Sequence, residues 1–434
     1  MRVRDRGNAW VVAMVGCTAL IAAAVASAVT TTSLKQAGQQ APTPMATSGP
    51  SQSTYSKMPA QPPPTAPVMT PQMKNAAQAA ARAFPWPAQL LTGLGPYLSL
   101  SSQLFRQAPT SPYAFAEVTQ GAGGGSIAGT YLARIDLATG AIELGQRTNG
   151  IPTQVGSQIG LSVPAGTTSR GAPTGPWHLA WVQPGSPKAS GDLAIPQAGK
   201  GSWLPVASTA DERSSGYLWA FCSNQVFEVN PATGAPSHII TFDGSGSAHV
   251  STKLDCASGA RTPQVQNPEI GFGAGELYVP VDYLTADPTT PVPVRIFALA
   301  TGSEKIEGEA ALPNAIAGPT LAPVPGGVWA SYRTGTTGNA ELLSNHGLDP
   351  LGRWYPKGAT PYPVWALATP RTTWIQSGVQ IACVAPGAAS VLAATAIPSQ
   401  DPDLDVGAVW NGRLFATEGQ NVILEITPPS ACLA

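Results

Sequence analysis

Three segments of this sequence repeat one pattern, and the repeat limits the possible folds more than any other feature. Each segment has an apolar stretch ending in Thr-Gly, at 130–140 (TYLARIDLATG), 216–234 (GYLWAFCSNQVFEVNPATG) and 275–302 (GELYVP to FALATG). Asp136 and Asn230 begin two of the closing turns, and a Gly ends each of the three. A tight turn between strands needs a polar starter that bonds its own backbone and a Gly where φ is positive. The endings therefore predict structural turns, joining the third and fourth strands of a repeated unit.

Aromatic residues recur inside apolar stretches along the rest of the chain, at Phe115, Trp181, Trp219, Tyr278, Trp329, Trp374 and Phe415. Their consecutive spacings are 66, 38, 59, 51, 45 and 41 residues. A period of roughly 40–50 residues with several short strands per unit is typical of a β-propeller. The 46 Gly and 44 Pro residues suit many strands joined by turns. We expect an all-β fold of seven four-stranded blades over 83–434, with six or eight blades as alternatives.

The last unit, 412–428 (GRLFATEGQNVILEITP), belongs to a blade that shows only about three strands. A ring must close to remove its sheet edges, so the missing outer strand has to come from elsewhere. The early apolar piece 96–105 (PYLSLSSQLF) is the candidate that the sequence offers.

The motif G-x-L-W followed by N/D-x-x-T-G resembles the blades of bacterial seven-bladed propellers of the YVTN and streptogramin-lyase-like kind, and 412–428 is similar to a streptogramin-lyase blade. The resemblance implies the seven-bladed architecture. Streptogramin lyases rely on a His and Glu constellation with Mg²⁺, and the motifs that carry those residues cannot be found here. Glu418, in the final unit, and the His residues in loops are the local candidates, and no catalytic residue is transferred.

The N-terminus predicts export. Residues 1–8 carry three Arg, and residues 9–29 (AWVVAMVGCTALIAAAVASAV) carry no charge. Twenty-one residues at helical rise span about 30 Å, the thickness of a hydrocarbon core. Because the Arg residues lie only on the N-terminal side, we expect 1–8 in the cytoplasm, 9–29 as a transmembrane signal anchor, and the remainder outside. Cleavage near 23–28, which would give a secreted protein, and a lipoprotein site at Cys17 are the alternatives.

Residues 30–82 read as a disordered linker. Residues 31–72 hold nine Pro among Ser, Thr, Gln and Ala, without apolar periodicity. As extended polyproline, 42 residues would reach on the order of 130 Å. The Ala-rich piece 73–83 is expected to form a few helical turns that end before Pro85.

The charge of the predicted head excludes one class of partner. Residues 83–434 hold 16 basic and 23 acidic side chains, a net charge of −7. Nucleic-acid binding needs a basic patch, so we expect no nucleic-acid partner.

Four cysteines lie outside the apolar segment: Cys222, Cys256, Cys383 and Cys432. In an exported domain without C-x-x-C spacing they predict disulfides rather than a zinc site. Three connectivities are possible, and we favour Cys222–Cys256 with Cys383–Cys432, since each joins nearby units. The alternative is that some of these thiols are free and buried.

Two further groups are candidates for binding. Asp401, Asp403 and Asp405 resemble the start of a calcium loop, but Gly407 comes one place late and no Glu follows at the required distance. We therefore predict no cofactor, with Ca²⁺ or Mg²⁺ as the weaker reading.

Most Trp residues sit in apolar strands and suit blade packing. Trp203, Trp354 and Trp365 stand in loop-like contexts and are the candidate ligand contacts.

These features favour a membrane-tethered, exported propeller that binds a protein, glycan or small molecule at its axial face. The alternative is a lyase or hydrolase, of the streptogramin-lyase-like kind, that works at the central funnel. Fold alone does not decide between them. A quinone-cofactor propeller is a third reading, for which no repeated Trp signature is found.

Overall fold

The computed structural model describes residues 68–100, 104–106, 110–123, 126–148, 151–155, 158–167, 173–195, 203–207, 218–222, 224–230, 233, 235–255, 263–265, 269–270, 276–283, 294–300, 302–315, 319–334, 337–354, 365–369, 371–377, 380–397, 404–419 and 421–433. Within these ranges no helix has the length and apolar character that a bilayer crossing requires. The expected anchor 9–29, Cys17 and most of the expected linker lie outside them.

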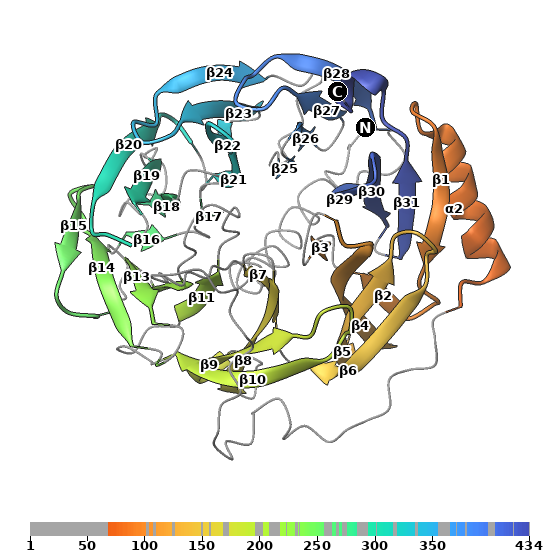
Figure 1. Cartoon of the computed structure of the whole chain (residues 1–434), viewed down its shortest axis with the longest axis horizontal. Helices are drawn as coiled ribbons and strands as arrows, with labels where there is room; N and C mark the ends of the chain where they lie inside the picture. Colours follow the sequence, from red (N-terminus) through yellow and green to blue (C-terminus); the bar gives the residue numbers. More distant parts are fainter. Residues whose placement is uncertain are drawn as a thin grey trace, which may run out of the picture.

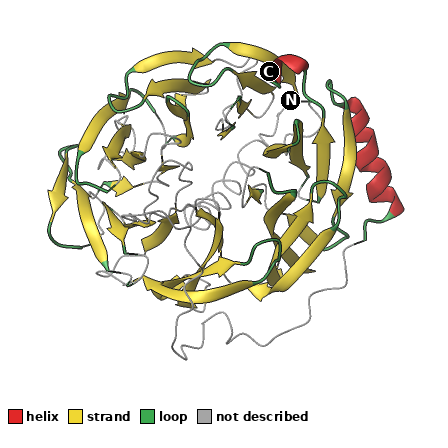
Figure 2. Cartoon of the chain, viewed as in Figure 1, coloured by secondary structure: helices red, strands yellow, loops and turns green. Residues whose placement is uncertain are grey.

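The described strands form seven sheets arranged in a ring about one axis (Figures 1 and 2). Each sheet is a blade of antiparallel strands that runs from the axis to the rim, so the expected all-β, seven-bladed propeller is confirmed.

The first three blades contain the following strands. Blade 1 has β2 (Leu98–Leu100) and β3 (Phe105–Arg106) beside β4 (Tyr113–Gly123), then β5 (Ser126–Asp136) and β6 (Ile142–Thr148). Blade 2 has β7 (Ile151–Val155), β8 (Gln158–Thr167), β9 (Pro173–Val182) and β10 (Ala189–Ile195). Blade 3 has β11 (Trp203–Ala207), β12 (Leu218–Cys222), β13 (Gln225–Val229), β14 (Pro236–Phe242) and an added β15 (Ala248–Ser251).

The remaining blades follow the same order. Blade 4 has β16 (Gln264–Val265) and β17 (Glu269–Ile270) beside β18 (Glu276–Asp282), then β19 (Val294–Ala300) and β20 (Ile306–Leu312). Blade 5 has β21 (Thr320–Val324), β22 (Gly327–Thr334), β23 (Thr337–Ser344) and β24 (Pro350–Trp354). Blade 6 has β25 (Trp365–Ala368), β26 (Thr373–Ser377), β27 (Gln380–Val384) and β28 (Val391–Ala396). Blade 7 has β29 (Asp405–Trp410), β30 (Arg413–Glu418), β31 (Val422–Ile426) and β1 (Ala88–Gly93).

Blade 7 joins the two ends of the described chain. The N-terminal strand β1 pairs antiparallel with β31, and Gln89 lies opposite Glu425. The expectation that 96–105 supplies this outer strand is therefore wrong, because that segment provides β2 and β3, the innermost strands of blade 1 (Figure 1). Both segments are short and apolar, and composition alone does not separate an inner strand from an outer one.

Helix α2 (Pro71–Ala83) confirms the expected helical turns and covers the outside of β1 (Figure 2). Thr70 caps it by accepting a hydrogen bond from the Met73 N–H at 3.2 Å. Ala77 and Ala81 are buried in a core cluster that also contains residues of blades 6 and 7. The packed head thus includes the helix, which lies before the boundary at residue 83 that the sequence suggested.

The core consists of apolar layers between neighbouring blades, and the repeated aromatic residues supply much of it. Trp219, Tyr278 and Phe415 are fully buried on the second strands of blades 3, 4 and 7. Phe115, Trp329 and Trp374 hold the same strand position in blades 1, 5 and 6. All five residues of β13 are buried, which suits a strand between two neighbouring blades.

The Thr-Gly turns join third and fourth strands, as expected. Between β5 and β6 the Asp136 carboxylate accepts hydrogen bonds from the N–H groups of Ala138 and Thr139, at 2.9 and 3.2 Å. The Asn230 side chain accepts in the same way from Thr233, at 3.2 Å. Gly140 adopts φ +75°, which is the backbone conformation that only Gly adopts at little cost.

Candidate functional site

The ring has two faces, one at each end of its axis. We call the end of the axis at which innermost strands such as β11 and β25 begin the entry face. The opposite end, which carries turns such as 136–141, 300–305 and 344–350, is the turn face. Because strands alternate in direction within each blade, innermost strands share one orientation and these turns all fall on one face.

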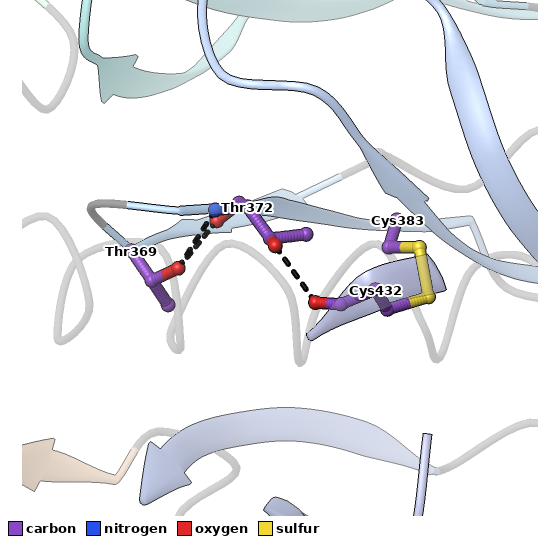
Figure 3. The surroundings of a disulfide bond; sticks show 4 residues. All are labelled: Thr369, Thr372, Cys383 and Cys432. Atoms are coloured by element: carbon purple, nitrogen blue, oxygen red, sulfur yellow. Dashed lines mark hydrogen bonds between the residues drawn. A yellow bond between two sulfur atoms is a disulfide. The ribbon is translucent and has the colours of Figure 1, made fainter. Parts of the chain in front are cut away.

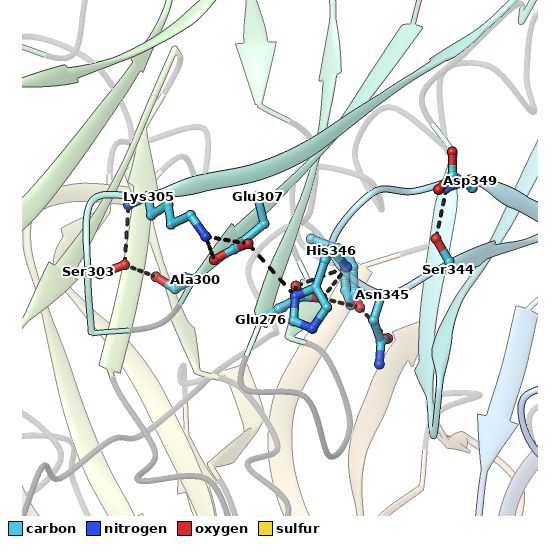
Figure 4. A network of polar contacts seen from close by, with 10 residues as sticks. Glu276, Ala300, Ser303, Lys305, Glu307, Ser344, Asn345, His346 and Asp349 are labelled. Atoms are coloured by element: carbon cyan, nitrogen blue, oxygen red, sulfur yellow. Dashed lines mark hydrogen bonds and ion pairs between the residues drawn. The ribbon is translucent and has the colours of Figure 1, made fainter.

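A network of polar side chains lies on the turn face, between blades 4 and 5 (Figure 4). Its centre is Glu276, the first residue of β18, whose side chain is 1% exposed. The backbone N–H of His346, from the β23–β24 turn, lies 3.0 and 3.2 Å from the two oxygens of Glu276. The Nδ1 atom of His346 contacts the same carboxylate. One buried carboxylate thus fixes both the backbone and the imidazole of a residue in the next blade.

Tyr278, two residues after Glu276 in β18, also belongs to the network. Its hydroxyl lies 2.7 Å from Oε2 of Glu276 and 3.0 Å from Oδ1 of Asn345. Burial, followed by the charge of Glu276, raises the pKa of Tyr278 above its ordinary value. The hydroxyl therefore remains protonated and serves as a hydrogen-bond donor at physiological pH.

The outer side of the network faces solvent. The His346 side chain is 63% exposed, and Glu307 lies 3.9 Å from its Nδ1. Lys305 in turn pairs with Glu307 at 2.8 Å. With Nδ1 on a carboxylate, Nε2 is the nitrogen available to a solute. A carboxylate-oriented imidazole of this kind can act as a general base or acid.

A second Glu–His pair lies one blade earlier. Glu228 of β13 is buried, and one of its oxygens accepts a hydrogen bond from the Gly302 N–H in the blade 4 turn, at 2.8 Å. The other oxygen contacts Nδ1 of His238 in β14. As with Glu276, the carboxylate bonds a backbone N–H of the following blade. We conclude that both carboxylates serve blade-to-blade cohesion.

At the entry face, a buried amide side chain links two blades in a similar way. Gln376 of β26 accepts a hydrogen bond from the Val406 N–H at 2.8 Å, and its Nε2 donates to the Leu404 carbonyl. This side chain therefore bridges the backbones of blades 6 and 7.

The sequence did not single out Glu228, Glu276 or Gln376. The available signal was a charged residue inside an otherwise apolar strand, as in GELYV and VFEVN. A buried charge implies a dedicated partner, because desolvation without one is costly.

The three candidate Trp residues occupy different places, and the expectation of loops is wrong for all of them. Trp203 and Trp365 are the first residues of the innermost strands β11 and β25, at the entry face (Figure 1). Trp354 ends the outermost strand β24 and is buried in the cluster between blades 5 and 6. Trp203 lies opposite Cys222 and Trp365 lies opposite Gln376, and this pairing with the next strand places both residues in sheets.

One expected disulfide is present. Cys383 of β27 is bonded to Cys432 in the short helix η2 (Ser430–Cys432), which attaches the C-terminal tail to blade 6 (Figure 3). Thr372 supports it by donating a hydrogen bond to the Cys432 carbonyl at 2.8 Å. Cys222 lies in β12, and Cys256 lies outside the described residues.

The candidate calcium loop runs into the start of β29. Asp401 and Asp403 lie outside the described residues, while Asp405 begins β29 opposite Thr417. Among the residues that the structure describes, no group of three His, Cys, Asp or Glu side chains could hold a metal ion. Glu418 is buried at the end of β30.

No protein-family model and no curated protein matches this sequence. Among solved structures it is similar to BamB from Moraxella catarrhalis, at 12% identity and a TM-score of 0.35, over 78% of this chain and 84% of that one. It is also similar to prolyl oligopeptidase B from Galerina marginata, at 13% identity and a TM-score of 0.39, over 74% and 46%. A third is U3-55K, at 10% identity and a TM-score of 0.46, over 79% and 98%. At these values the assignment of the fold rests on the strand pairing described above.

Proposed function

We propose that this chain is an exported, membrane-tethered β-propeller that acts as a binding module at the cell surface. The observation that carries the proposal is the closure of the ring by β1, the first described strand. Strand β1 completes blade 7, and α2 packs outside it on the rim. A tether that precedes α2 would therefore leave the rim and obstruct neither face. The uncharged segment 9–29 then serves as the anchor, and the Pro-rich residues that precede α2 serve as the spacer.

The placement is tested on intact cells that produce the full chain. We expect added protease to digest the head, and alkaline carbonate to leave the chain with the membranes. A head that is protected in intact cells would contradict export. A mature N-terminus near residue 29, with the protein in the medium, would contradict tethering and favour cleavage.

We place the ligand-binding surface at the entry face, around Trp203 and Trp365. Both residues begin innermost strands, so they stand at the same end of the axis on blades 3 and 6. Aromatic side chains offer a large apolar surface at low entropic cost, which suits a glycan or a small-molecule ligand. Trp354, buried between blades, does not enter this proposal.

The entry face is tested with arrays of immobilised glycans and peptides. The full chain in mild detergent is compared with a Trp203→Ala/Trp365→Ala variant and with a Val250→Ala control on β15. We expect the double variant to lose about tenfold or more in affinity for any probe bound, a loss of about 1.4 kcal/mol or more. Equal binding by all three proteins would exclude the two Trp residues as contacts.

A second candidate function is a hydrolase or lyase, and one observation favours it. The exposed His346 imidazole is oriented by the buried Glu276, as a general base requires. A panel of chromogenic esters and glycosides would be assayed with the parent and with His346→Gln. Turnover that disappears in the variant, with the melting temperature kept, would favour the enzyme over the binding module.

A further inference from the structure

The two ends of the described chain meet in one apolar cluster at the junction of blades 6 and 7. On the N-terminal side, the connector 84–87 between α2 and β1 carries Phe84 and Trp86, which are 6% and 9% exposed. On the C-terminal side, Cys432 is 2% exposed and is bonded to Cys383 (Figure 3). The same cluster includes the buried residues of α2. The segment that closes the ring and the disulfide therefore share one core.

Trp86 links the connector to blade 6. Its ring packs against Trp374 of β26 in a T-shaped arrangement, with ring centroids 6.0 Å apart and an interplanar angle of 71°. Trp374 lies directly opposite Cys383 of β27. Residues opposite one another in an antiparallel pair point to the same side of the sheet. The Trp86 contact and the disulfide therefore occupy the same face of blade 6, the face that packs against blade 7.

The C-terminal tail that follows β31 also holds the connector. The Thr427 N–H donates a hydrogen bond to the Pro87 carbonyl at 2.7 Å, directly before β1 begins. Further along the tail, Cys432 fastens it to blade 6. The disulfide therefore fixes a segment that contacts the connector. We call these residues the terminal clasp: 84–87, Trp374, Cys383, Thr427 and Cys432.

We propose that the terminal clasp is a redox-sensitive switch on ring closure. With the Cys383–Cys432 bond intact, the α2–β1 segment stays docked, and reduction of the bond lets this segment open locally. Strand β1 joins blade 7 through noncovalent pairing with β31. Local opening of a terminal segment costs less than unfolding of a whole domain. A tail tied to blade 6 restrains both Thr427 and the cluster on which Trp86 packs, so the bond makes this opening rarer.

The coupling does not depend on the proposed export, but export would set the time at which it forms. Disulfides persist in oxidising compartments and are rare in the cytosol. An exported head would therefore complete the terminal clasp only after it leaves the cytoplasm. Failure of the coupling would leave the proposed placement standing, since the protease test on intact cells addresses that placement separately.

Hydrogen exchange of the full chain in detergent tests the switch. A dithiol reductant supplies two electrons and two protons to the Cys383–Cys432 bond, so that two thiols form and the reductant becomes a cyclic disulfide. We expect the amides of α2 and β1 to exchange about tenfold or more faster after reduction, a change of about 1.4 kcal/mol or more. The amides of β13 in blade 3 should change far less. Equal acceleration in both regions, or none in α2 and β1, would overturn the proposal.

Two cysteine variants identify the bond responsible. Cys432→Ser cannot form the bond and should show the fast exchange of α2 and β1 without reductant, with no further change when reductant is added. Cys222→Ser leaves the bond intact and should respond to reductant as the parent does. A response to reductant that persists in Cys432→Ser would assign the effect to another disulfide and contradict the switch.

The reverse direction provides an independent test, because a coupling between two contacts is reciprocal. The disulfide is buried, so a reductant reaches it only when the cluster opens. Trp86→Leu should make reduction several-fold faster, measured by mass spectrometry of alkylated Cys432. Phe242→Leu, which trims a buried aromatic residue between blades 3 and 4, is the matched control and should keep the parent's rate. Equal rates in the two variants, compared at the same interval below their melting temperatures, would show that the connector does not guard the bond.

Discussion

At the scale of single residues, buried polar side chains hold neighbouring blades together. Glu276 accepts from the next blade's backbone, as does Glu228, and Gln376 bridges two backbones at the opposite face. A buried carboxylate is stable only with such partners. Their hydrogen bonds to the next blade account for their burial.

Removal of the Glu276 carboxylate should destabilise the ring. Glu276→Ala leaves the His346 N–H without its acceptor and removes one of the two acceptors of the Tyr278 hydroxyl. We expect a loss of about 2–4 kcal/mol in the free energy of unfolding, measured with chemical denaturant. Glu309→Ala, which removes a carboxylate exposed on β20, is the control and should cost about 1 kcal/mol or less. Equal effects would contradict the bridging role.

The pH dependence of stability should reveal Glu117 of β4. Burial raises the pKa of this carboxyl in the folded state. The folded protein therefore holds the proton more tightly than the unfolded chain, and stability falls as pH rises from the ordinary carboxyl pKa through the raised one.

Glu117→Gln, which stays neutral, should therefore melt higher than the parent at neutral pH. The difference should shrink as pH falls towards about 4, near the ordinary carboxyl pKa. Melting curves across this range provide the measurement, and a difference that stays constant with pH would exclude the assigned shift.

At the scale of elements, the outer strands pack on the next blade through glycines that the repeat pattern did not reveal. A Cβ added at Gly308 of β20 would lie 1.8 Å from the His346 carbonyl oxygen, in the blade 5 turn. A Cβ added at Gly145 of β6 would likewise lie 2.2 Å from the carbonyl oxygen of Pro187, in blade 2. A side chain at these positions would push adjacent blades apart.

Gly308→Ala should therefore destabilise the protein by about 1–3 kcal/mol through overpacking. Gly121→Ala in β4 is the matched control, because its nearest atom would be 3.8 Å away, an ordinary contact. Thermal unfolding of the two variants gives the comparison. A Gly308→Ala variant as stable as the control would show that the blades can separate at little cost.

The sequence predicted the elements well where local chemistry decides them. Asp136, Asn230 and the Gly residues that follow gave the turns, because turn residues act through their own backbone. The spacing of the aromatic residues gave the blades, although the intervals on the two sides of Trp181, 66 and 38 residues, are unequal. That residue lies on the third strand of blade 2, whereas the other anchors lie on second strands.

What sequence reasoning missed depends on contacts distant in the chain. The closing strand β1 meets β31 across more than three hundred residues, and nothing local in AQLLTG marks it as an outer strand. Trp354 gives no sign in GRWYP that blade 6 buries it. The hydrogen bonds of Glu276 likewise come from another blade.

At the scale of the whole molecule, the disulfide fastens the end of the chain beside the ring closure. Cys383 and Cys432 are 49 residues apart and enclose most of blade 7. Cross-linking a loop of this length removes unfolded-state entropy worth about 2–4 kcal/mol.

Cys432→Ser should lower the free energy of unfolding by that amount. Cys383→Ser and the double variant should cost the same, because each removes the same bond. Additive losses would show that the two thiols do not form one disulfide. Urea denaturation of the full chain in detergent gives the values.

The central claim is a seven-bladed ring closed by its N-terminal strand, and cross-linking of β1 to β31 tests it most directly. Oxidation of a Gln89→Cys/Glu425→Cys variant should give an intrachain disulfide, identified by mass spectrometry of the linked peptides, because these residues lie opposite one another. A Ser99→Cys/Glu425→Cys variant should not link, since Ser99 belongs to the innermost strand of blade 1. A disulfide in the second variant and none in the first would show that 96–105, and not 88–93, closes the ring.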